Sequence, residues 1–191
     1  KPTIDGEPSY EAIPQGLHDV NEVFWNDSDV RRYGYWSVFA GAFGYTYGHN
    51  AIMQFYTPND KEPGFGAKDY WDVAMNDAGA GQMIHLKNLM LSRSFFDRIP
   101  NQKLLAENGE KYDYKVATSG ENYAFIYTYR GGVVKVNMSE LNASNVKVSW
   151  FNPRNGETTQ LDVVEANGIQ EFVAPGEIVD GNDWVLILDK V

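Results

Sequence analysis

The chain has 191 residues, 43% of them hydrophobic, and a formal net charge of −10, so it is long enough to bury a core as one domain or two small ones. Its 16 basic residues are scattered, which argues against nucleic acid and anionic membrane surfaces as partners. No apolar run is long enough to cross a bilayer, and the absence of cysteine excludes disulfides and thiolate metal sites without fixing the compartment.

The first half of the chain alternates short strands with helices. A strand is predicted over residues 1–4, a helix capped by Asp or Ser over 29–42, and a second strand over 45–47. An amphipathic helix is predicted over 79–93. Strand, helix, strand, helix in this order is typical of a parallel sheet with covering helices. Because two parallel strands cannot cover their own edges, we expect partner strands from an upstream segment that completes a barrel, or from a symmetric copy, and we favour the former.

After about residue 105 the pattern changes to short alternating segments separated by turn signals. Residues 123–129 and 133–136 are predicted to form a hairpin through an Arg-Gly-Gly turn. A strand over 146–150 leads into an Asn-Pro-Arg-Asn-Gly turn. The last strand, 184–188, is apolar on both faces and is therefore predicted to be central in its sheet. Seven or eight such strands indicate a β-sandwich.

Glu7 is the sharpest catalytic candidate. A carboxylate at the carboxyl end of a parallel strand points into the mouth where barrel enzymes hold their catalytic groups. Glu11, four residues further on, is its rival. A retaining nucleophile needs a second carboxyl group about 5–5.5 Å away, which we expect on a missing strand. The alternative for both residues is a solvated or salt-bridged loop acid.

Residues near the two strand ends are candidate sugar contacts. His49 and Asn50 end the second strand and are placed to hydrogen-bond substrate hydroxyls, unless they form a structural turn pair. Tyr10, Trp25 and Trp36 are candidates for a sugar-stacking wall, although Trp36, on the predicted helix, is more typical of a core residue.

The remaining polar residues give weaker signals. Arg31 and Arg32 are placed to orient Glu7 or to pair with Asp29. No pair of histidines has metal-ligand spacing. No phosphate-binding loop, nucleophile-elbow serine or catalytic triad is present. We therefore expect neither a metal nor a cofactor.

Five segments in a fixed order carry a resemblance to a known family. They are KPTIDGEPSYE, DVRRYGYWSVFAGAFGYTYGHNAIMQFY, GAGQMIHLKNLMLSRSFFDRIP, WFNPRNGE and GNDWVLILD. Together they resemble the apiosidase-like glycoside hydrolases, which are glycoside hydrolase family 140 and its relatives, a domain of formerly unknown function numbered 4038. The resemblance implies an α/β plus all-β fold: the C-terminal β/α units of a (β/α)8 TIM barrel over 1–104, followed by an antiparallel β-sandwich over 105–191.

The same resemblance implies roles for individual residues. GEPSYE matches the end of the seventh barrel strand, where related hydrolases keep the nucleophile, and so implies that role for Glu7. YGHN matches the end of the eighth strand, beside the sugar site. The acid/base carboxylate lies earlier in the barrel, outside this chain, so the chain alone is expected to be inactive. The candidate substrate-binding residues are His49, Asn50, Tyr10, Glu11, Trp25 and Tyr47.

The resemblance implies a secreted, periplasmic or cell-surface enzyme of plant cell-wall polysaccharide degradation, as in the family's Bacteroidota members. A carbohydrate is then the substrate, and the N-terminal part of the same barrel is the partner. Apiosidase activity on pectic side chains is one activity of the family, and its sandwich is labelled a collagen-binding domain of a collagenase. Two other functions stay open for the sandwich: a module that binds carbohydrate or collagen through exposed aromatic residues, or a structural buttress of the barrel through the helix over 79–93.

Overall fold

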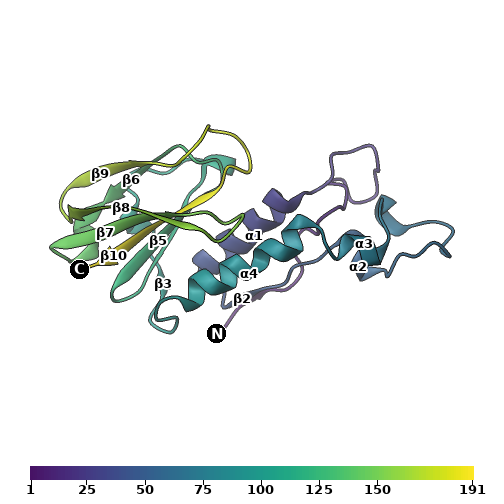
Figure 1. Ribbon diagram of the computed structural model, residues 1–191, viewed down its shortest axis with the longest axis horizontal. Helices are drawn as coiled ribbons and strands as arrows, with labels where there is room; N and C mark the ends of the chain where they lie inside the picture. The colour runs from purple at the N-terminus through teal and green to yellow at the C-terminus, as the bar shows by residue number, and fades with distance from the viewer.

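The computed structural model describes all residues from 1 to 191. The molecule is elongated, with a β-sandwich at one end, two long helices in the middle, and two short helices at the far end (Figure 1). None of its helices is both long and apolar enough to cross a membrane.

The first two strands form the predicted parallel pair. β1 (Ile4–Asp5) pairs with β2 (Gly44–Tyr45), and α1 (Asp27–Phe39) connects them. The cap of α1 is Asn26, one residue before the predicted position. Its side chain accepts hydrogen bonds from the Ser28 and Asp29 amides, while the Asp29 carboxylate accepts one from the Asn26 amide. This capping box explains the difference, because Asn also caps helices well and the acid that completes the box lies three residues after it.

A long excursion separates β2 from the second long helix. It contains α2 (Asn50–Met53), the 3₁₀ turn η1 (Gly64–Gly66) and α3 (Trp71–Ala74), and it projects away from the sandwich (Figure 1). α4 (Ala78–Leu91) follows and corresponds to the helix predicted over 79–93. Of its predicted apolar face, Leu86, Leu89 and Met90 are buried.

Eight strands build the sandwich, as predicted. The large sheet has the order β3-β4-β5-β10-β7-β8, and β6 pairs with β9 in a second, two-stranded sheet. Short 3₁₀ turns η2 (Gln102–Leu104), η3 (Lys111–Asp113) and η4 (Met138–Leu141) join some of them. The strands are β3 (Ile99–Pro100), β4 (Val116–Ser119), β5 (Tyr123–Thr128), β6 (Val133–Asn137), β7 (Asn145–Phe151), β8 (Thr158–Glu165), β9 (Ile169–Val173) and β10 (Trp184–Lys190).

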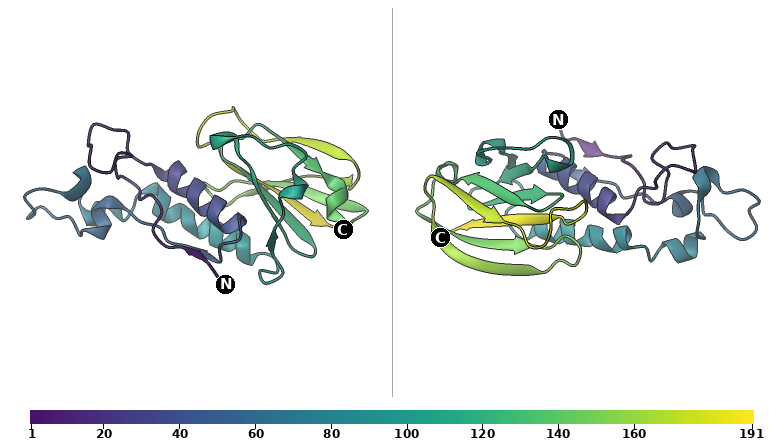
Figure 2. Two further views of the ribbon diagram at one scale, coloured as in Figure 1. Left: turned by 180° about the vertical axis from the view of Figure 1, so that it is seen from behind. Right: turned by 90° about the horizontal axis from the view of Figure 1, so that it is seen from above.

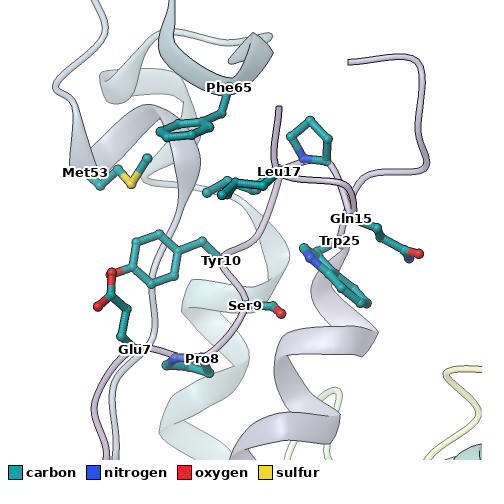
Figure 3. A pocket seen from close by; sticks show the side chains of 11 residues that line it. Glu7, Pro8, Ser9, Tyr10, Gln15, Leu17, Trp25, Met53 and Phe65 are labelled. Atoms are coloured by element: carbon teal, nitrogen blue, oxygen red, sulfur yellow. The ribbon is translucent and has the colours of Figure 1, made fainter. Parts of the chain in front are cut away.

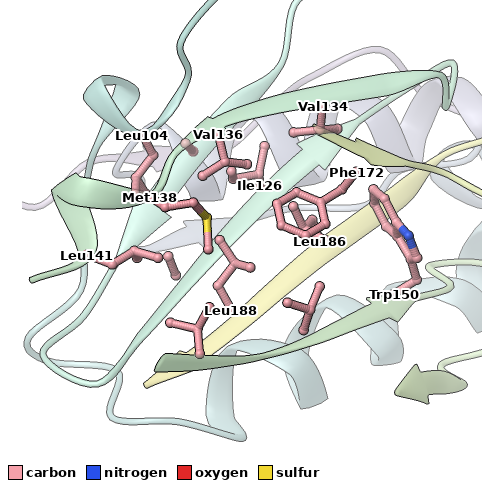
Figure 4. Close-up of a cluster of buried hydrophobic side chains, with 14 of the residues drawn as sticks. Leu104, Ile126, Val134, Val136, Met138, Leu141, Trp150, Phe172, Leu186 and Leu188 are labelled. Atoms are coloured by element: carbon pink, nitrogen blue, oxygen red, sulfur yellow. The ribbon is translucent and has the colours of Figure 1, made fainter. Parts of the chain in front are cut away.

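The last strand is central, which confirms the prediction from its apolar faces. β10 lies between β5 and β7 and pairs antiparallel with both. Leu186 and Leu188 face the core between the two sheets (Figure 4), whereas Val185 and Ile187 face a second core on the opposite side. Both faces of β10 are therefore buried.

The predicted hairpin between β5 and β6 is wrong. β5 pairs with β4 and β10, and β6 crosses to the other sheet to pair with β9. All six residues of β5 are buried, and its two edges are already occupied, so no edge is left for β6. The Gly131-Gly132 turn, with φ of 72° and 77°, suits a hairpin equally well, so the local sequence does not distinguish the two topologies.

The second core joins the helices to the sandwich. Tyr123, Phe125, Tyr127 and Tyr129 share one side of the large sheet and pack with apolar residues of α1 and α4. The rings of Tyr35 and Tyr127 stack with their centroids 4.8 Å apart. The result is three layers: the small sheet, the large sheet, and the helix pair (Figure 2).

A buried ion pair crosses the same interface. Nε and Nη2 of Arg31 donate to the two carboxylate oxygens of Asp183, each at 3.0 Å, and the Tyr127 hydroxyl donates to Asp183 at 3.1 Å. Arg32 pairs with Asp29 at 2.8 Å, as one of its predicted alternatives had it. Arg31 thus links α1 to the loop before β10.

Candidate active site

Residues 6–10 leave the parallel strand pair and carry the first candidate acid. Strand-like hydrogen bonds join the Thr46 amide to the Asp5 carbonyl before this segment, and the Glu11 amide to the Gly48 carbonyl after it. Residue 11 again bridges to residue 49 in parallel fashion. The segment therefore bulges out at the carboxyl end of β1, where Glu7 and Tyr10 are displayed.

A pocket of about 520 Å³ opens beside this bulge (Figure 3). Its volume is within the range of roughly 300–1,000 Å³ that is usual for ligand sites. Three predicted site residues line it together: Glu7, Tyr10 and Trp25. The Glu7 carboxylate points toward the hydroxyl end of Tyr10 (Figure 3). The other lining residues are Pro8, Ser9, Ile13, Pro14, Gln15, Leu17, Met53 and Phe65.

Tyr10 and Trp25 are held in the pocket by close packing. The Tyr10 ring packs closely against the backbone of Gly48. A Cβ atom on residue 48 would lie only 2.3 Å from Tyr10 Cδ1. The Trp25 ring meets Tyr33 edge-on at 5.9 Å, and the buried guanidinium of Arg32 lies 6.0 Å from its centroid. Such fixed ring positions are what stacking on a sugar face requires.

Glu11 lies behind the pocket. Its side chain is 7% exposed, accepts a hydrogen bond of 2.6 Å from the Tyr47 hydroxyl, and accepts one of 3.4 Å from the Gly79 amide at the start of α4. A Cβ atom at Gly79 would lie 2.2 Å from Glu11 Oε2, so glycine is needed there. Glu11 and Tyr47 therefore fasten the bulge to the segment after β2 and to α4.

The side chains of His49 and Asn50 are also engaged within the chain. His49 caps α2 by accepting from the Ala51 amide through Nδ1 at 3.1 Å, and its Nε2 lies 2.8 Å from Asp77 Oδ2. Asn50 Nδ2 donates to the carbonyls of Ala12 and Phe65 at 2.8 and 2.9 Å. Neither residue lines the pocket. Their contact with a substrate stays a prediction, and their hydrogen bonds favour a supporting role.

The sequence did not indicate the apolar side of the pocket. Leu17 and Phe65 come from two irregular segments, and Met53 ends the one-turn helix α2. These segments have no apolar period, so pattern analysis finds nothing in them. Leu17 and Phe65 also have positive φ angles of 62° and 50°, which side chains other than glycine rarely adopt. The only signal that could have found them was the run of Gly, Pro and Asn around them.

Glu11 gives a pH dependence that can be measured. Burial raises the pKa of Glu11 above its ordinary value of 4.5, although the hydrogen bonds from Tyr47 and Gly79 oppose the shift. The folded state thus binds this proton more tightly than the unfolded state, so the stability from Glu11 is full below about pH 4.5 and is lost as the pH rises through the raised pKa. We expect the wild type to lose stability relative to Glu11→Gln as the pH rises above about 4.5.

Urea unfolding of the full-length protein and the variant across this pH range measures the difference. Glu62→Gln, in an exposed loop, serves as the control for a general charge effect. A difference between wild type and Glu11→Gln that stays constant with pH would contradict the expected shift.

Comparison with solved structures covers the whole chain. A structure described as "Glycoside hydrolase" is 47% identical, with a TM-score of 0.96, and the match covers 100% of this chain and 42% of that one. A glycoside hydrolase family 5 structure from Bacteroides vulgatus ATCC 8482 is 44% identical, with the same TM-score and the same coverage. The chain therefore spans less than half the length of either structure. No curated protein matches it.

Comparison with protein families divides the chain in two. Residues 99–189 match the family described as "Putative collagen-binding domain of a collagenase". Residues 1–97, which hold the β1–α1–β2 unit, the pocket and α4, match the family described as "Apiosidase-like, catalytic domain". As the sequence resemblance predicted, the chain belongs to the apiosidase-like family of glycoside hydrolases.

Proposed function

We propose that this chain is the C-terminal portion of a retaining glycoside hydrolase that acts on pectic glycans of the plant cell wall, with Glu7 as the nucleophile. The observation that carries the proposal is the position of Glu7. It lies just after a parallel strand and lines a pocket with Tyr10 and Trp25. Carboxylates of barrel hydrolases occupy this position at the carboxyl ends of their strands.

The chemistry follows from a single carboxylate in the pocket. Glu7 attacks the anomeric carbon, the bond to the leaving oxygen breaks, and a general acid donates a proton to that oxygen. Water then displaces Glu7 from the glycosyl-enzyme, and the same group takes up its proton. Glu7 is the only carboxylate among the lining residues. The acid/base group is therefore assigned to the N-terminal part of the barrel, outside this chain, on a strand that brings it about 5–5.5 Å from Glu7.

The other candidate residues divide into two groups in this proposal. Tyr10 and Trp25, in the pocket, stack on the sugar. The four residues Glu11, Tyr47, His49 and Asn50 hold the bulge and its neighbours from behind. Export to the periplasm or the cell surface is part of the proposal and rests on the family resemblance alone.

For the sandwich we propose a buttressing role rather than a separate binding function. Its large sheet packs its aromatic side against α1 and α4. These aromatic residues are therefore buried in the interface and cannot stack on a sugar. The exposed large hydrophobic residues of its strands are aliphatic, namely Ile99, Val133, Leu161, Val163, Ile169 and Val173. An aromatic row suited to carbohydrate is therefore absent from these strands, and collagen recognition has no residue here that requires it.

The stereochemistry of the product tests the mechanism. The full-length protein, incubated with plant rhamnogalacturonan, is expected to release a sugar that first carries the anomeric configuration of the cleaved linkage, because two displacements at one carbon restore it. Proton NMR in the first minutes, before mutarotation, detects it. The opposite first anomer would show an inverting enzyme and remove the nucleophile role. Absence of any released sugar would count against pectic substrates.

A further inference from the structure

Backbone strain gathers around the pocket. Six residues other than glycine have positive φ angles in the chain, and four of them, Ala12, Leu17, Phe55 and Phe65, lie in the pocket wall or in the segments beside it. Side chains other than glycine rarely hold this conformation unless the surrounding structure imposes it. Something must therefore hold these segments in place.

The amides of Asn50 and Gln54 hold two of the segments. Asn50 Nδ2 joins the carbonyls of Ala12 and Phe65, both of which have left-handed backbone. Gln54 Nε2 donates to Asn50 Oδ1 at 2.7 Å and to the Gly64 carbonyl at 3.0 Å, and its Oε1 accepts from the Gly64 amide at 2.7 Å. We call Asn50 and Gln54 the amide clip. Both N–H groups of the fully buried Asn50 amide donate a hydrogen bond, so neither is left unsatisfied.

The two segments also contact each other directly. The His18 and Phe65 rings stack with centroids 5.4 Å apart. A Cβ atom at Gly66 would lie 2.6 Å from Val20 Cγ1, so the two segments touch at this point. Lys68 Nζ lies 3.7 Å from the centroid of the Phe24 ring. Residues 15–25 and 54–68 therefore pack against each other beside the pocket.

Three apolar side chains gather on this side of the pocket, apart from the polar Gln15, which lies near Trp25 (Figure 3). Leu17, Met53 and Phe65 lie together on one side, while Glu7 lies on the other side of Tyr10 (Figure 3). A sugar hydroxyl turned toward these three side chains finds no donor or acceptor among them. A ring face that presents C–H groups, in contrast, makes favourable contact with an aromatic ring.

We propose that Phe65, with Leu17 and Met53, forms a specificity-determining wall for a sugar unit that presents a C–H face or a methyl group, and that Asn50 is its positioning residue. The inference deepens the proposed function, on which it rests. It assigns Asn50 an indirect role: the residue acts on the glycan only through the backbone of Phe65.

Binding to a protein that cannot turn over tests the wall. In full-length protein carrying Glu7→Gln, the added change Phe65→Ala is expected to weaken binding of acid-released rhamnogalacturonan oligosaccharides by roughly fivefold. Phe55→Ala is the matched control, because Phe55 is also a phenylalanine with positive φ on the same excursion but does not line the pocket. Its binding should equal that of the parent. Isothermal titration calorimetry gives the apparent Kd.

The positioning role of Asn50 has a separate readout. Asn50→Ala is expected to weaken binding as much as Phe65→Ala, and the double variant should be no weaker than either, because both changes remove the same wall. If the double variant weakens binding by the product of the two single losses, the positioning role is overturned, and Asn50 touches the sugar itself. Gln54→Ala, which removes the half-buried member of the clip, gives the same comparison if Asn50→Ala does not fold.

The outcomes separate this inference from the proposed function. If the wild type hydrolyses the glycan and Phe65→Ala binds as tightly as its parent, the wall is wrong and the hydrolase stands. If no hydrolysis occurs but binding depends on Phe65, the wall stands and the proposed reaction falls. If the glycan is neither bound nor cleaved, both are overturned.

Discussion

Replacement of Asp183 by asparagine is expected to lower the free energy of unfolding by about 3–5 kcal/mol. Asp183 is fully buried and holds Arg31, itself 1% exposed, through two hydrogen bonds. Loss of the negative charge leaves the guanidinium buried with only Asp27, at the edge of the site, to balance it. Removal of one partner of such a pair costs far more than the intact pair contributes.

Asp189→Asn provides the matched control. Asp189, in β10, also binds an arginine with both oxygens: Arg93, in the segment just after α4, donates to it at 2.9 and 2.7 Å. This pair is partly exposed, with 26% of the Arg93 side chain and 17% of the Asp189 side chain accessible. We therefore expect a loss of at most about 1 kcal/mol. Urea unfolding of both variants in the full-length protein measures the difference, and equal losses would mean that burial at Asp183 is not the cause.

The part of the fold that could be predicted is the part in which one residue pattern has one structural solution. A strand apolar on both faces must be covered on both sides, and β10 lies between two cores. The helical apolar spacing of α4 likewise specifies one buried side. The pairing of β6 could not be predicted in this way. Its alternation fits either sheet, and the decision depends on which strands occupy the edges of β5, far away in the sequence.

In the candidate site, too, some features could be predicted from the sequence and others could not. Glu7, Tyr10 and Trp25 were predicted because a strand end and an aromatic composition indicate where a sugar site lies. The separation of Glu7 from Glu11 was not predicted, although the two lie four residues apart. It arises because the chain rejoins the parallel pairing at Glu11, whose side chain then turns toward Tyr47 and α4. The bulge of residues 6–10 depends on tertiary contacts, and the spacing of residues in the sequence does not predict it.

The separation of Glu7 from Glu11 predicts opposite effects of replacing the two residues. Glu7→Gln is expected to lower kcat of the full-length enzyme by roughly three orders of magnitude or more, because an amide cannot form the glycosyl-enzyme ester. Glu7 is exposed and lies outside the hydrogen bonds that fasten the bulge, so the thermal unfolding midpoint should not change. Glu11→Gln should do the opposite: it changes stability and keeps kcat within about threefold, since Glu11 does not line the pocket.

Chemical rescue identifies the nucleophile directly. With Glu7→Ala, added azide is expected to restore cleavage, because the small anion enters the space of the lost carboxylate and attacks the anomeric carbon in its place. One displacement then replaces two, so the glycosyl azide should have the anomeric configuration opposite to that of the substrate. Azide should not accelerate Glu11→Ala, whose buried space does not open to the pocket. Rescue at position 11 and none at position 7 would transfer the nucleophile role to Glu11.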